Sequence, residues 1–587
     1  MSVRSRRGVT VLGVGVAGLA IAVLVILPPA AIETGPFTSS TRASPVRGAY
    51  HIHSVRSDGS GTVDEIAAAA ARAGLQFIIV TDHGDGTRPP DPPTYRSGVL
   101  TIDAVELNTT GGHYAALGLP ATPYPFAGTP EDVIDDVHRL GGFGIAAHPG
   151  SPRPTLTWQA WDTGFDGLEW INADSEWRDE PWQALAQALF TFPLRAAESM
   201  AALLDRPDAV FAKWDEASRT RRVVALAGAD AHARLGLRAR TDPDRSSLHV
   251  PWPGYDASFR TFSNHVVLDG PLTGNALIDA PHVLDAIRQG RVFTVVDGLA
   301  TPGGLEFSVN SGHEVARMGE DRAIDGPLTL RARMTAPPGT TLVLLRDGQP
   351  VRHTQVDLNA SLTSDPGVYR LEAYLPSGPG APPVPWIVSN PIYVGFNRGS
   401  GVQAFRGSGV QRRNAAAAVA GDEVPLSRIP ARTSEATPEF GAGDSSAVTV
   451  SDARGGAMAG EPPAVWTFAL APGTPRGQFA AIRIPITGGL AAFDRARFSV
   501  VSGRPMRVWA QLRASAGNTG RWGRTFYADE QPRTINLSLK DFQSIGVTSA
   551  SRPPLDKVDS LLFVVDTLNT LPGGKGSITI SDVAFVR

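Results

Sequence analysis

Histidine and carboxylate side chains gather in one part of this sequence, in types and spacings that suit metal binding. Ten of the 12 histidines lie between His51 and His282. Neutral imidazole and ionised carboxylate are suitable ligands for Zn²⁺, Mn²⁺ and Fe²⁺. Nine candidate ligands lie at or just after apolar, strand-like runs: His51, His53, Asp58, His83, Glu106, His113, His148, Asp230 and His232. Nine are too many for one ion, so the sequence predicts two or three divalent metal ions, with carboxylates bridging them.

The grouping of these ligands strengthens the interpretation. In His51-Ile52-His53 both imidazoles lie on the same side of a strand, because side chains alternate with a period of two. One such pair is a weak indication of a metal site, whereas five motifs at five strand ends are a strong one. The alternative is a set of unrelated histidines with local hydrogen bonds, and those are expected in mid-strand rather than at strand exits.

Strands and helices alternate from about Gly48 to Val296 and are predicted to position these ligands. Thr62 and Glu65 form a capping box before an alanine-rich helix that stops at Gly74. The predicted strands are Ala49–Ile52, Phe77–Thr81, Leu100–Leu107, Tyr114–Leu119, Phe143–Ala147, Gly167–Ile171, Val223–Ala227 and Val292–Val295. This alternation favours a parallel barrel or a doubly wound sheet. In a parallel barrel the carboxyl ends of all strands lie on one face, so the nine ligands are expected to meet in one cleft.

Further helical patterns surround the later ligands. Thr129-Pro130 begins one helix, with proline at its first position. Two more run from about Trp182 to Leu204 and from Asp208 to Arg219. The first of these carries an apolar stripe, which either packs against the barrel or caps the cleft as a lid. The stripe consists of Trp182, Leu185, Leu189 and Phe190.

The ligand pattern resembles that of the PHP family, the polymerase and histidinol phosphatase superfamily of metal-dependent hydrolases. The resemblance covers about residues 48–296, less than half of the chain. It rests on His51-x-His53, Ser57-Asp58-Gly59, Thr81-Asp82-His83, Glu106, His113, His148-Pro149 and Asp230-Ala231-His232. It implies an α/β fold, a distorted (β/α)7 barrel, with three metals at the carboxyl ends of the strands. It also implies that the nine candidate ligands hold those metals.

The chemistry that such a cluster supports is hydrolysis. A hydroxide that bridges two metals is nucleophilic near neutral pH, because metal binding lowers the pKa of water to about 7–9. Three arginines follow ligand-bearing segments and are candidates for binding a substrate phosphate through two hydrogen bonds. They are Arg153, Arg178 and Arg234, and the alternative for each is a solvated surface side chain.

Three functions from two classes fit the sequence. The leading hypothesis is a metal-dependent phosphoesterase that acts on a small, phosphorylated substrate. The second keeps the metals and changes the bond to a carbamate, ester or amide, because the PHP site is similar to that of the amidohydrolases. The third is a surface glycan-binding protein with an inactive barrel. A role on nucleic acid is not expected, because the net charge is −3 and no basic patch stands out.

The N-terminus indicates a membrane or an export route. Arg4, Arg6 and Arg7 precede the uncharged run Val9–Leu27, whose 19 residues would span about 29 Å as a helix. That length favours an uncleaved anchor, while a cleaved signal peptide and a buried helix remain alternatives. The basic flank is expected to stay in the cytoplasm. The chain is therefore predicted to be membrane-anchored or secreted, with its bulk extracytoplasmic.

The rest of the chain is predicted to be β-rich. The 62 glycines and 48 prolines indicate many turns, and the absence of cysteine excludes disulfides and cysteine-ligated zinc. Asp347-Gly348 between two strand-like runs is a hairpin signal. The terminal part looks like the galactose-binding-type jelly roll of carbohydrate-binding modules, and Trp509, Trp522 and Tyr527 either stack on sugars or fill its core. The expected order is a signal anchor or signal peptide (1–32), a PHP metallohydrolase barrel (47–297), an Ig-like β-sandwich (298–396), a flexible linker (397–445) and a galactose-binding-like β-sandwich (446–587).

Overall fold

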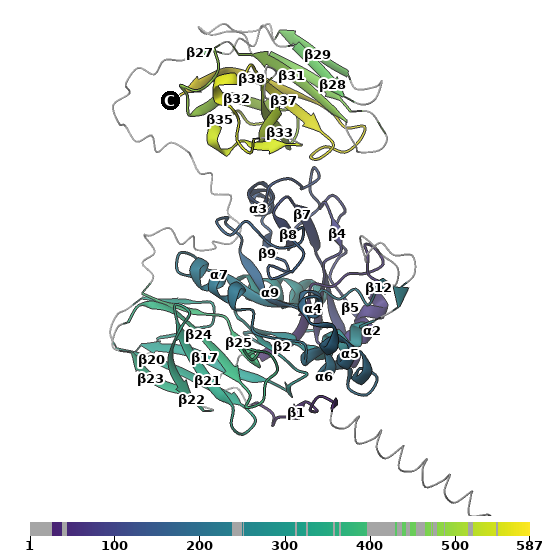
Figure 1. The fold of residues 1–587 in the computed structure, drawn as a ribbon, viewed down its shortest axis with the longest axis vertical. Helices are drawn as coiled ribbons and strands as arrows, with labels where there is room; N and C mark the ends of the chain where they lie inside the picture. The colour runs from purple at the N-terminus through teal and green to yellow at the C-terminus, as the bar shows by residue number, and fades with distance from the viewer. Residues whose placement is uncertain are drawn as a thin grey trace, which may run out of the picture. The chain divides into compact units, whose positions relative to one another are not determined.

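The computed structural model describes residues 26–37, 44–236, 249–250, 252–311, 314–323, 327–355, 358–362, 365–395, 429–430, 437–441, 447–452, 464–470, 472, 478–486, 488–514, 520–546 and 550–587. The chain divides into two units (Figure 1). The first comprises Met1–Gly84, Pro89–Pro120 and Thr129–Gly407, and the second comprises Asp85–Arg88, Ala121–Gly128 and Ser408–Arg587. The candidate metal ligands all belong to the first unit.

A ring of hydrogen-bonded strands forms the centre of the first unit. In order around the ring these are β2 (Ser44–Tyr50), β3 (Phe77–Val80), β6 (Val99–Asp103) with β7 (Val105–Thr109), β8 (Gly112–Leu117), β9 (Phe143–Ala146), β10 (Gly167–Asn172) and β11 (Val224–Gly228). Only Ala104 separates β6 from β7, so the chain itself joins the two sheets. Ala229 N donates to Tyr50 O and Ala231 N to His51 O, which closes the ring between β11 and β2. Alternate side chains, such as Phe77, Ile79 and Leu226, fill its core.

Two strands depart from the predicted pattern. The predicted strand Leu100–Leu107 is broken at Ala104 into β6 and β7, which belong to different sheets. The strand predicted at Tyr114–Leu119 is β8, and it runs antiparallel to both β7 and β9. Only Thr110 and Gly111 separate β7 from β8, and a turn this short forms a hairpin because a parallel crossover needs a dozen or more residues.

Helices cover the ring where the sequence marks their ends. Helix α2 (Val63–Arg72) has the predicted capping box of Thr62 and Glu65. Helix α3 (Pro130–Arg139) begins after Thr129, whose side chain caps it. Both predictions are confirmed. The other helices are α4 (Ala173–Asp179), α5 (Trp182–Thr191), α6 (Ala196–Ala201), α7 (Asp208–Ser218), α8 (Tyr255–Thr261) and α9 (Ala276–Arg288). The long pattern predicted from Trp182 to Leu204 is thus two shorter helices, α5 and α6.

The apolar stripe of α5 does not pack against the ring of strands. Trp182 is 72% exposed, Leu189 57% and Phe190 52%, so the packing alternative is wrong for these three residues. The side chains that α5 buries are Ala188 and Thr191. A stripe in the sequence defines one face of a helix but does not say whether that face turns inward.

The first β-sandwich continues the sheet of the ring. Strand β14 (Ser263–Leu268) pairs with β2, β15 (Val292–Val295) pairs with β14, and β25 (Ile387–Ser389) pairs with β15. Beyond β25 the sheet contains β24 (Gly367–Tyr374), β26 (Ile392–Val394), β19 (Asp321–Arg322), β21 (Thr341–Arg346) and β22 (Gln349–Thr354). The second sheet contains β18 (Glu314–Arg317), β17 (Gly304–Ser311), β20 (Leu328–Thr335) and β23 (Leu358–Leu362). The ring and this sandwich therefore share one continuous sheet.

Two local features belong to this sandwich. Asp347 and Gly348 join β21 to β22 with φ angles of 52° and 82°, so the predicted hairpin is confirmed. Arg370 of β24 lies between the sandwich and α7, with Nη1 2.6 Å from Asp215 Oδ1 and Nη2 2.8 Å from Glu372 Oε1. Its guanidinium also lies 4.5 Å from the ring centre of Trp214. This buried ion cluster joins the two parts of the unit.

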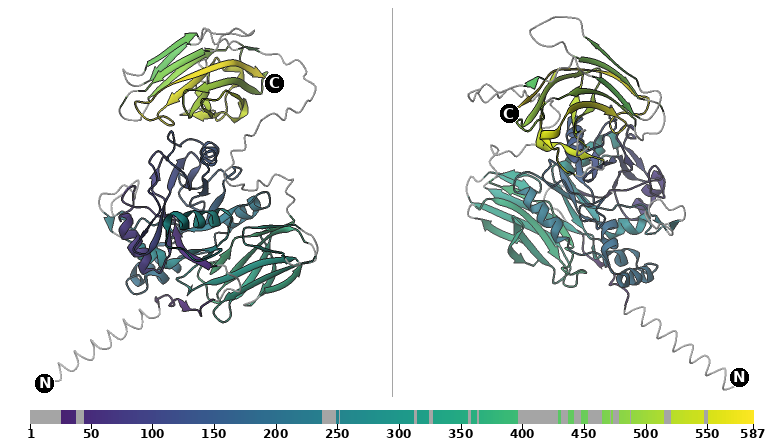
Figure 2. Two further views of the ribbon diagram at one scale, coloured as in Figure 1. Left: turned by 180° about the vertical axis from the view of Figure 1, so that it is seen from behind. Right: turned by 45° about the horizontal axis from the view of Figure 1, so that its top comes forward.

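The second unit contains the terminal β-sandwich, whose two layers of strands are visible in Figures 1 and 2. One sheet comprises β27 (Ile429–Pro430), β29 (Ala447–Asp452), β30 (Ala464–Ala469), β32 (Arg495–Ser502), β35 (Arg533–Ser538) and β38 (Lys575–Val586). The other comprises β28 (Thr437–Gly441), β31 (Phe479–Pro485), β33 (Met506–Ala514), β34 (Gly520–Ala528), β36 (Gln543–Ile545) and β37 (Ser560–Asp566). The predicted linker covers residues 397–445. Strands β27 and β28 lie in this range but belong to the sandwich, because they pair with β38 and β31.

The remaining strands are short: β1 (Ile32–Glu33), β4 (His83–Gly84), β5 (Thr94–Arg96), β12 (Leu235–Gly236), β13 (His249–Val250) and β16 (Ala300–Thr301). The predicted organisation, several domains that include two β-sandwiches, is confirmed. Among the described helices, none is both long and apolar enough to cross a membrane. All but Ile26 and Leu27 of the apolar run Val9–Leu27 lie outside the described residues.

Candidate metal centre

All nine predicted ligands lie together at one end of the ring of strands. They form four overlapping groups, in each of which the potential ligand atoms lie within 4.8 Å of one another. The groups are His53, Asp58, His83 and His232; His51, Glu106 and His148; His51, His53 and Asp230; and His83, Glu106 and His113. Shared members connect the groups, which is the arrangement that a multinuclear site requires.

Glu106 is at the centre of this cluster and is fully buried. Its Oε2 atom lies 3.1 to 3.3 Å from ring nitrogens of His51, His53 and His83. Its Oε1 atom lies 2.8 Å from His113 Nδ1 and 3.0 Å from His148 Nε2. One carboxylate thus contacts five imidazoles, as expected of a group that bridges metal ions.

Two of these imidazoles are held with Nε2 directed at Glu106. His51 Nδ1 lies 2.5 Å from Glu169 Oε1, and His148 Nδ1 lies 3.1 Å from Leu156 O. A carboxylate or carbonyl oxygen can only accept, so each Nδ1 donates a proton to it, and Nε2 is the nitrogen that would bind a metal. A hydrogen bond of this kind on the second ring nitrogen is typical of metal-bound histidine.

Glu169 is the functional residue that the sequence analysis missed. Its Oε2 atom also accepts from His148 N and from Asn172 Nδ2, both at 2.7 Å. It fits because Gly228 faces it across the sheet, where a Cβ atom would lie 2.3 Å from its Cδ. A glutamate in an apolar strand was the available signal, since a lone charge there needs a buried partner.

The loop that carries Asp58 is fixed by Asp82. Asp82 accepts hydrogen bonds from Ser54 N at 2.7 Å, Ser54 Oγ at 2.6 Å and Ser57 Oγ at 2.7 Å. Gly59 lets the loop turn tightly, because a Cβ atom there would lie 2.1 Å from His53 O. The middle residue of the Thr81-Asp82-His83 motif therefore positions a neighbouring ligand.

Three of the ligands have backbone conformations that non-glycine residues rarely adopt. The φ angles of His51, His148 and Asp230 are 64°, 32° and 43°. Each of these residues lies at or just beyond the end of a strand, where the left-handed conformation turns its side chain toward the cluster. Backbone strain of this kind costs roughly 1–3 kcal/mol per residue and is concentrated at functional sites.

The donor atoms fit divalent metal ions. Within the described part of the chain, several buried donors of the cluster make no hydrogen bond: His51 Nε2, His53 Nε2, His83 Nδ1, Asp58 Oδ1 and Glu106 Oε2. Leaving buried polar atoms unpaired costs about 1–3 kcal/mol each, and a bound cation would satisfy all of them at once. Imidazole and carboxylate donors suit Zn²⁺, Mn²⁺ or Fe²⁺. The residues therefore fit divalent metal ions.

The electrostatics of the cluster are dominated by its opposite charges. Burial would raise the pKa of Glu106, but His51, His83 and His113 hold that pKa well below its usual range. Burial would lower the pKa of His83, yet Glu106 and Asp58 raise it to about 9. In the same way, Asp58 and Asp230 outweigh burial and raise the pKa of His232 to about 10. Without metal, both imidazoles are therefore protonated at neutral pH.

These shifts predict that metal affinity rises with pH. An imidazole must lose its proton to bind a metal, so His83 and His232 release protons when metal binds. In the metal-free protein, protonated His83 and His232 stabilise the fold below about pH 6.5, and this stability is lost as pH rises through about 9 to 10. The increase in Tm caused by Mn²⁺ should therefore grow between pH 6 and pH 9. An increase that stays constant over this range would contradict the prediction.

Glu169 is predicted to act as a positioning residue for His51. Replacing it in Glu169→Gln removes the charge that holds the Nδ1 proton and should lower metal affinity roughly 10- to 100-fold. Excess Mn²⁺ should restore turnover, because the ligand atoms themselves remain. Metal titration followed by activity provides the measurement. Unchanged affinity, or a loss of activity that excess metal does not relieve, would show that Glu169 has only a structural role.

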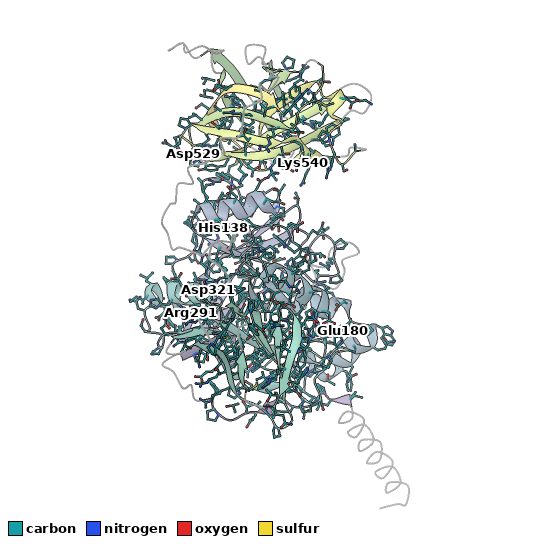
Figure 3. All side chains as sticks on the ribbon, turned by 90° about the vertical axis from the view of Figure 1, so that its left-hand side faces the viewer. His138, Glu180, Arg291, Asp321, Asp529 and Lys540 are labelled. Atoms are coloured by element: carbon teal, nitrogen blue, oxygen red, sulfur yellow. The ribbon has the colours of Figure 1, made fainter. Side chains whose placement is uncertain are left out.

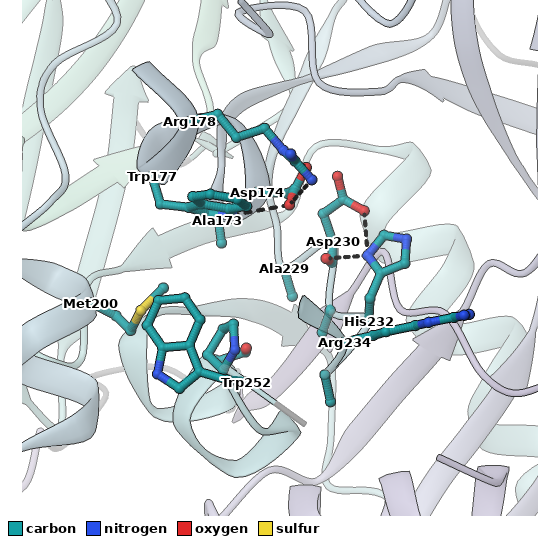
Figure 4. Close-up of a pocket in the computed structure, with 14 residues that line it drawn as sticks. Ala173, Asp174, Trp177, Arg178, Met200, Ala229, Asp230, His232, Arg234 and Trp252 are labelled. Carbon is teal, nitrogen blue, oxygen red and sulfur yellow. Dashed lines mark hydrogen bonds and ion pairs between the residues drawn. The ribbon is translucent and has the colours of Figure 1, made fainter. Parts of the chain in front are cut away.

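A small pocket adjoins Asp230 and His232 (Figure 4). Trp177, Met200 and Trp252 form an apolar wall, and polar side chains face it. The pocket is lined by Ala173, Asp174, Trp177, Arg178, Met200, Ala229, Asp230, Ala231, His232, Ala233, Arg234, Trp252, Pro253 and Ser258. Apolar and charged groups therefore meet beside the candidate metal ligands.

The three candidate arginines lie in different environments. Arg178 lines the pocket, with Nε 2.5 Å from Asp174 Oδ2 and Nη2 2.9 Å from Asp174 Oδ1. Arg234 also lines it and donates from Nη1 to Asp58 O at 3.3 Å. Arg153 is not among the described residues that line this pocket. His138 lies on α3 (Figure 3), and its Nε2 atom is 2.8 Å from Asp166 Oδ2.

The aromatic residues of the terminal sandwich divide between its core and its surface. Trp522 is 1% exposed and donates from Nε1 to Ala550 O, so it fills the core. Trp509 packs against the small cluster of Ala481, Leu562 and Val564 on the other side of its sheet. Trp522 is therefore unavailable for stacking on a sugar.

Comparison with known proteins gives limited overlap. No family model matches the chain. An uncharacterised protein of Methanocaldococcus jannaschii is 31% identical over 111 residues, which are 18% of this chain and 64% of that protein. The chain thus spans less than two thirds of the length of this relative.

Two solved structures resemble parts of the chain. A two-domain protein from Bacteroides vulgatus that contains a predicted PHP-like metal-dependent phosphoesterase aligns with 59% of this chain and 94% of its own, at 14% identity and a TM-score of 0.27. A family 11 carbohydrate-binding module of a Clostridium thermocellum cellulase aligns with 28% of this chain and 96% of its own, at 12% identity and a TM-score of 0.23. With TM-scores this low, neither likeness carries a conclusion about function.

Proposed function

We propose that this chain is a metal-dependent hydrolase of the PHP type, and that its first candidate activity is that of a phosphoesterase. The observation that carries the proposal is the environment of Glu106, whose two oxygens contact five imidazoles. Two of those imidazoles are oriented by Glu169 and by Leu156 O, so that Nε2 is the atom that remains for a metal. The ring of strands also supports the proposal, because the resemblance implies a distorted (β/α)7 barrel.

The residues of the cluster divide the work of hydrolysis. Two or three divalent ions, when bound, supply a nucleophilic hydroxide near neutral pH and positive charge for the developing oxyanion. Glu106 and the eight other predicted ligands would hold those ions, while Glu169 and Asp82 position ligand-bearing residues. Arg178 and Arg234 both line the pocket beside Asp230 and His232, so both are candidates to contact a phosphate.

Hydrolysis of a carbamate, ester or amide is the second candidate, and the pocket favours it. Trp177, Met200 and Trp252 form an apolar wall next to Asp230 and His232. An apolar wall suits a flat, uncharged leaving group, whereas a phosphate monoester brings two negative charges that use three close metals more fully. The charge of the metal site is the stronger of these two arguments, because it acts on the bond that breaks.

The deciding experiment compares matched substrates at equal metal loading. We expect a higher kcat/KM for an aryl phosphate than for an aryl carbamate with the same leaving group. The shared leaving group cancels the contribution of the apolar wall, so that the ratio reports the charge preference of the metal site. A ratio that favours the carbamate would replace the first candidate with the second.

The location of the enzyme is also a proposal. The run Val9–Leu27 behind three arginines supports attachment to a membrane, with the hydrolase on the extracytoplasmic side. A reporter fused after Arg587 should then be active only outside the cytoplasm. Activity of a reporter that works only in the cytoplasm would exclude this topology.

We propose the terminal sandwich as the part of the chain that would bind a cell-surface glycan. Trp509 and Gln511 lie on the same face of β33, because they are two residues apart. Gln511 Oε1 is buried without a hydrogen bond among the described residues. A galactose-binding-like module would use such a face, since an aromatic ring stacks on a sugar and an amide binds its hydroxyl groups. Retention on insoluble polysaccharides, compared with that of Trp509→Ala, tests this role.

A further inference from the structure

Helix α5 turns its large apolar side chains toward solvent and its small ones inward. Trp182, Leu189 and Phe190 share one face of the helix, because positions seven and eight residues apart lie on the same side. These three are 72%, 57% and 52% exposed, and Leu194, just after the helix, is 63% exposed. We refer to these four side chains as the α5 surface. A helix on a water-soluble surface normally has the reverse arrangement.

The orientation of α5 is fixed by its inward face. Thr191 is 1% exposed, and its Oγ1 lies 2.8 Å from the Oγ of Ser199, which is 1% exposed on α6. Ala188 is buried on the same side. The helix cannot turn its apolar face inward without exposing these contacts. The sequence of α5, WQALAQALFT, also contains no charged residue, so the exposed face lacks the groups that usually keep a helix hydrated.

The segment that follows the apolar N-terminal run lies against the same helices. Gln187 Nε2 of α5 donates to Ile26 O at 2.8 Å, and Arg195 Nη1 donates to Pro28 O. Figure 1 shows α5 and α6 on the side of the unit where β1 lies. Ile26 and Ile32 are themselves 38% and 44% exposed. Ile26, near the end of the run Val9–Leu27, is therefore hydrogen-bonded to α5.

We propose that the α5 surface is a lipid-binding surface that lies in the interfacial layer of the membrane. The proposal rests on the membrane attachment proposed above. A run of 19 residues that spans the hydrocarbon core brings its last residues to the membrane–water boundary. Since α5 is bonded to Ile26, the α5 surface is held at that same level. Tryptophan and phenylalanine are favoured at this depth, where their rings leave water while polar neighbours stay hydrated.

The chain offers a direct test because it contains no cysteine. Leu189→Cys on α5 and Leu277→Cys on α9 each provide one labelling site, and Leu277 is a matched control that is 67% exposed. The full chain, labelled with a small environment-sensitive fluorophore, is reconstituted into phosphatidylethanolamine–phosphatidylglycerol vesicles with or without brominated acyl chains. Brominated lipid should quench the label at position 189 several-fold more than the label at position 277. Phe190→Cys should reproduce the result at 189 if Leu189→Cys folds poorly.

Each other outcome contradicts the proposal in a distinguishable way. Equal, weak quenching at positions 189 and 277 would show that the α5 surface stays in water. A blue-shifted but unquenched label at 189 would indicate that another part of this chain covers it, or a second copy if the shift depends on protein density. Failure of the full chain to float with the vesicles would disprove the membrane attachment and this proposal together. Hydrolysis is measured on the same samples as a separate test of the proposed enzyme activity, because none of these three outcomes depends on it.

Discussion

Glu106→Gln is expected to remove most of the bound metal and to lower the rate of hydrolysis at least about a hundredfold. Even residues that only hydrogen-bond to a metal ligand contribute about 10- to 100-fold to metal affinity or activity. Glutamine keeps the shape of Glu106 but has no charge, and its NH₂ group cannot bind a metal. Both oxygens of Glu106 contact imidazoles, so the change affects every part of the cluster. Metal content of the purified protein and kcat/KM provide the measurements.

The control for this variant is Glu131→Gln, which makes the same chemical change at an exposed position in the first turn of α3. It should keep the metal content and turnover of the parent protein. The circular dichroism of Glu106→Gln should remain that of a folded protein, because the sandwiches share no ligand with the cluster. Normal metal stoichiometry and turnover in Glu106→Gln would refute the assignment of the metal centre.

Arg370→Met is expected to destabilise the first unit by about 3–5 kcal/mol, the usual effect of removing one partner of a buried ion pair. Arg370 is 3% exposed and contacts both Asp215 of α7 and Glu372 of β24. Without it, partly buried Asp215 loses its two hydrogen bonds to the Arg370 guanidinium, while Glu372 keeps its ion pair with Arg206. Urea unfolding followed by tryptophan fluorescence measures the loss.

Arg333→Met is the matched control for this change. Arg333 is 55% exposed, and its Nη1 atom lies 3.7 Å from Glu306 Oε2. Such surface pairs contribute about 0–1 kcal/mol. We expect the ring of strands and the first sandwich to unfold together in both variants, since they share one sheet. Equal unfolding midpoints for the two variants would show that the Arg370 cluster does not hold these parts together.

The sequence alone was sufficient to predict which histidines and carboxylates lie together. His51, His53 and Glu106 lie on or beside strands whose apolar runs are easily recognised, and strand ends in a barrel converge on one face. The caps of α2 and α3 and the Asp347-Gly348 hairpin were also predictable, because each depends on interactions within a few residues. Local rules of this kind do not depend on which distant strand becomes a neighbour.

Other features were decided only by the tertiary structure. Glu169 reaches His51 because β10 pairs with β11 and β11 meets β2, and no pattern within β10 itself indicates that order. The pairing of β15 with β25 joins the ring to the first sandwich, although 91 residues lie between Val295 and Ile387 in the sequence. The chemistry of a side chain determines what it can bind, whereas the pairing of strands distant in the sequence determines which residues it contacts.

Helix α5 shows the same division most clearly. Its sequence specifies a helix with one strongly apolar face, and periodicity fixes which side chains share that face. The direction of the face is a separate matter, because it depends on what the opposite side contacts. The Thr191–Ser199 contact and the buried Ala188 hold the small side inward. Sequence therefore determined the chemistry of the α5 surface and of the metal ligands, while tertiary packing determined that one is exposed and the other enclosed.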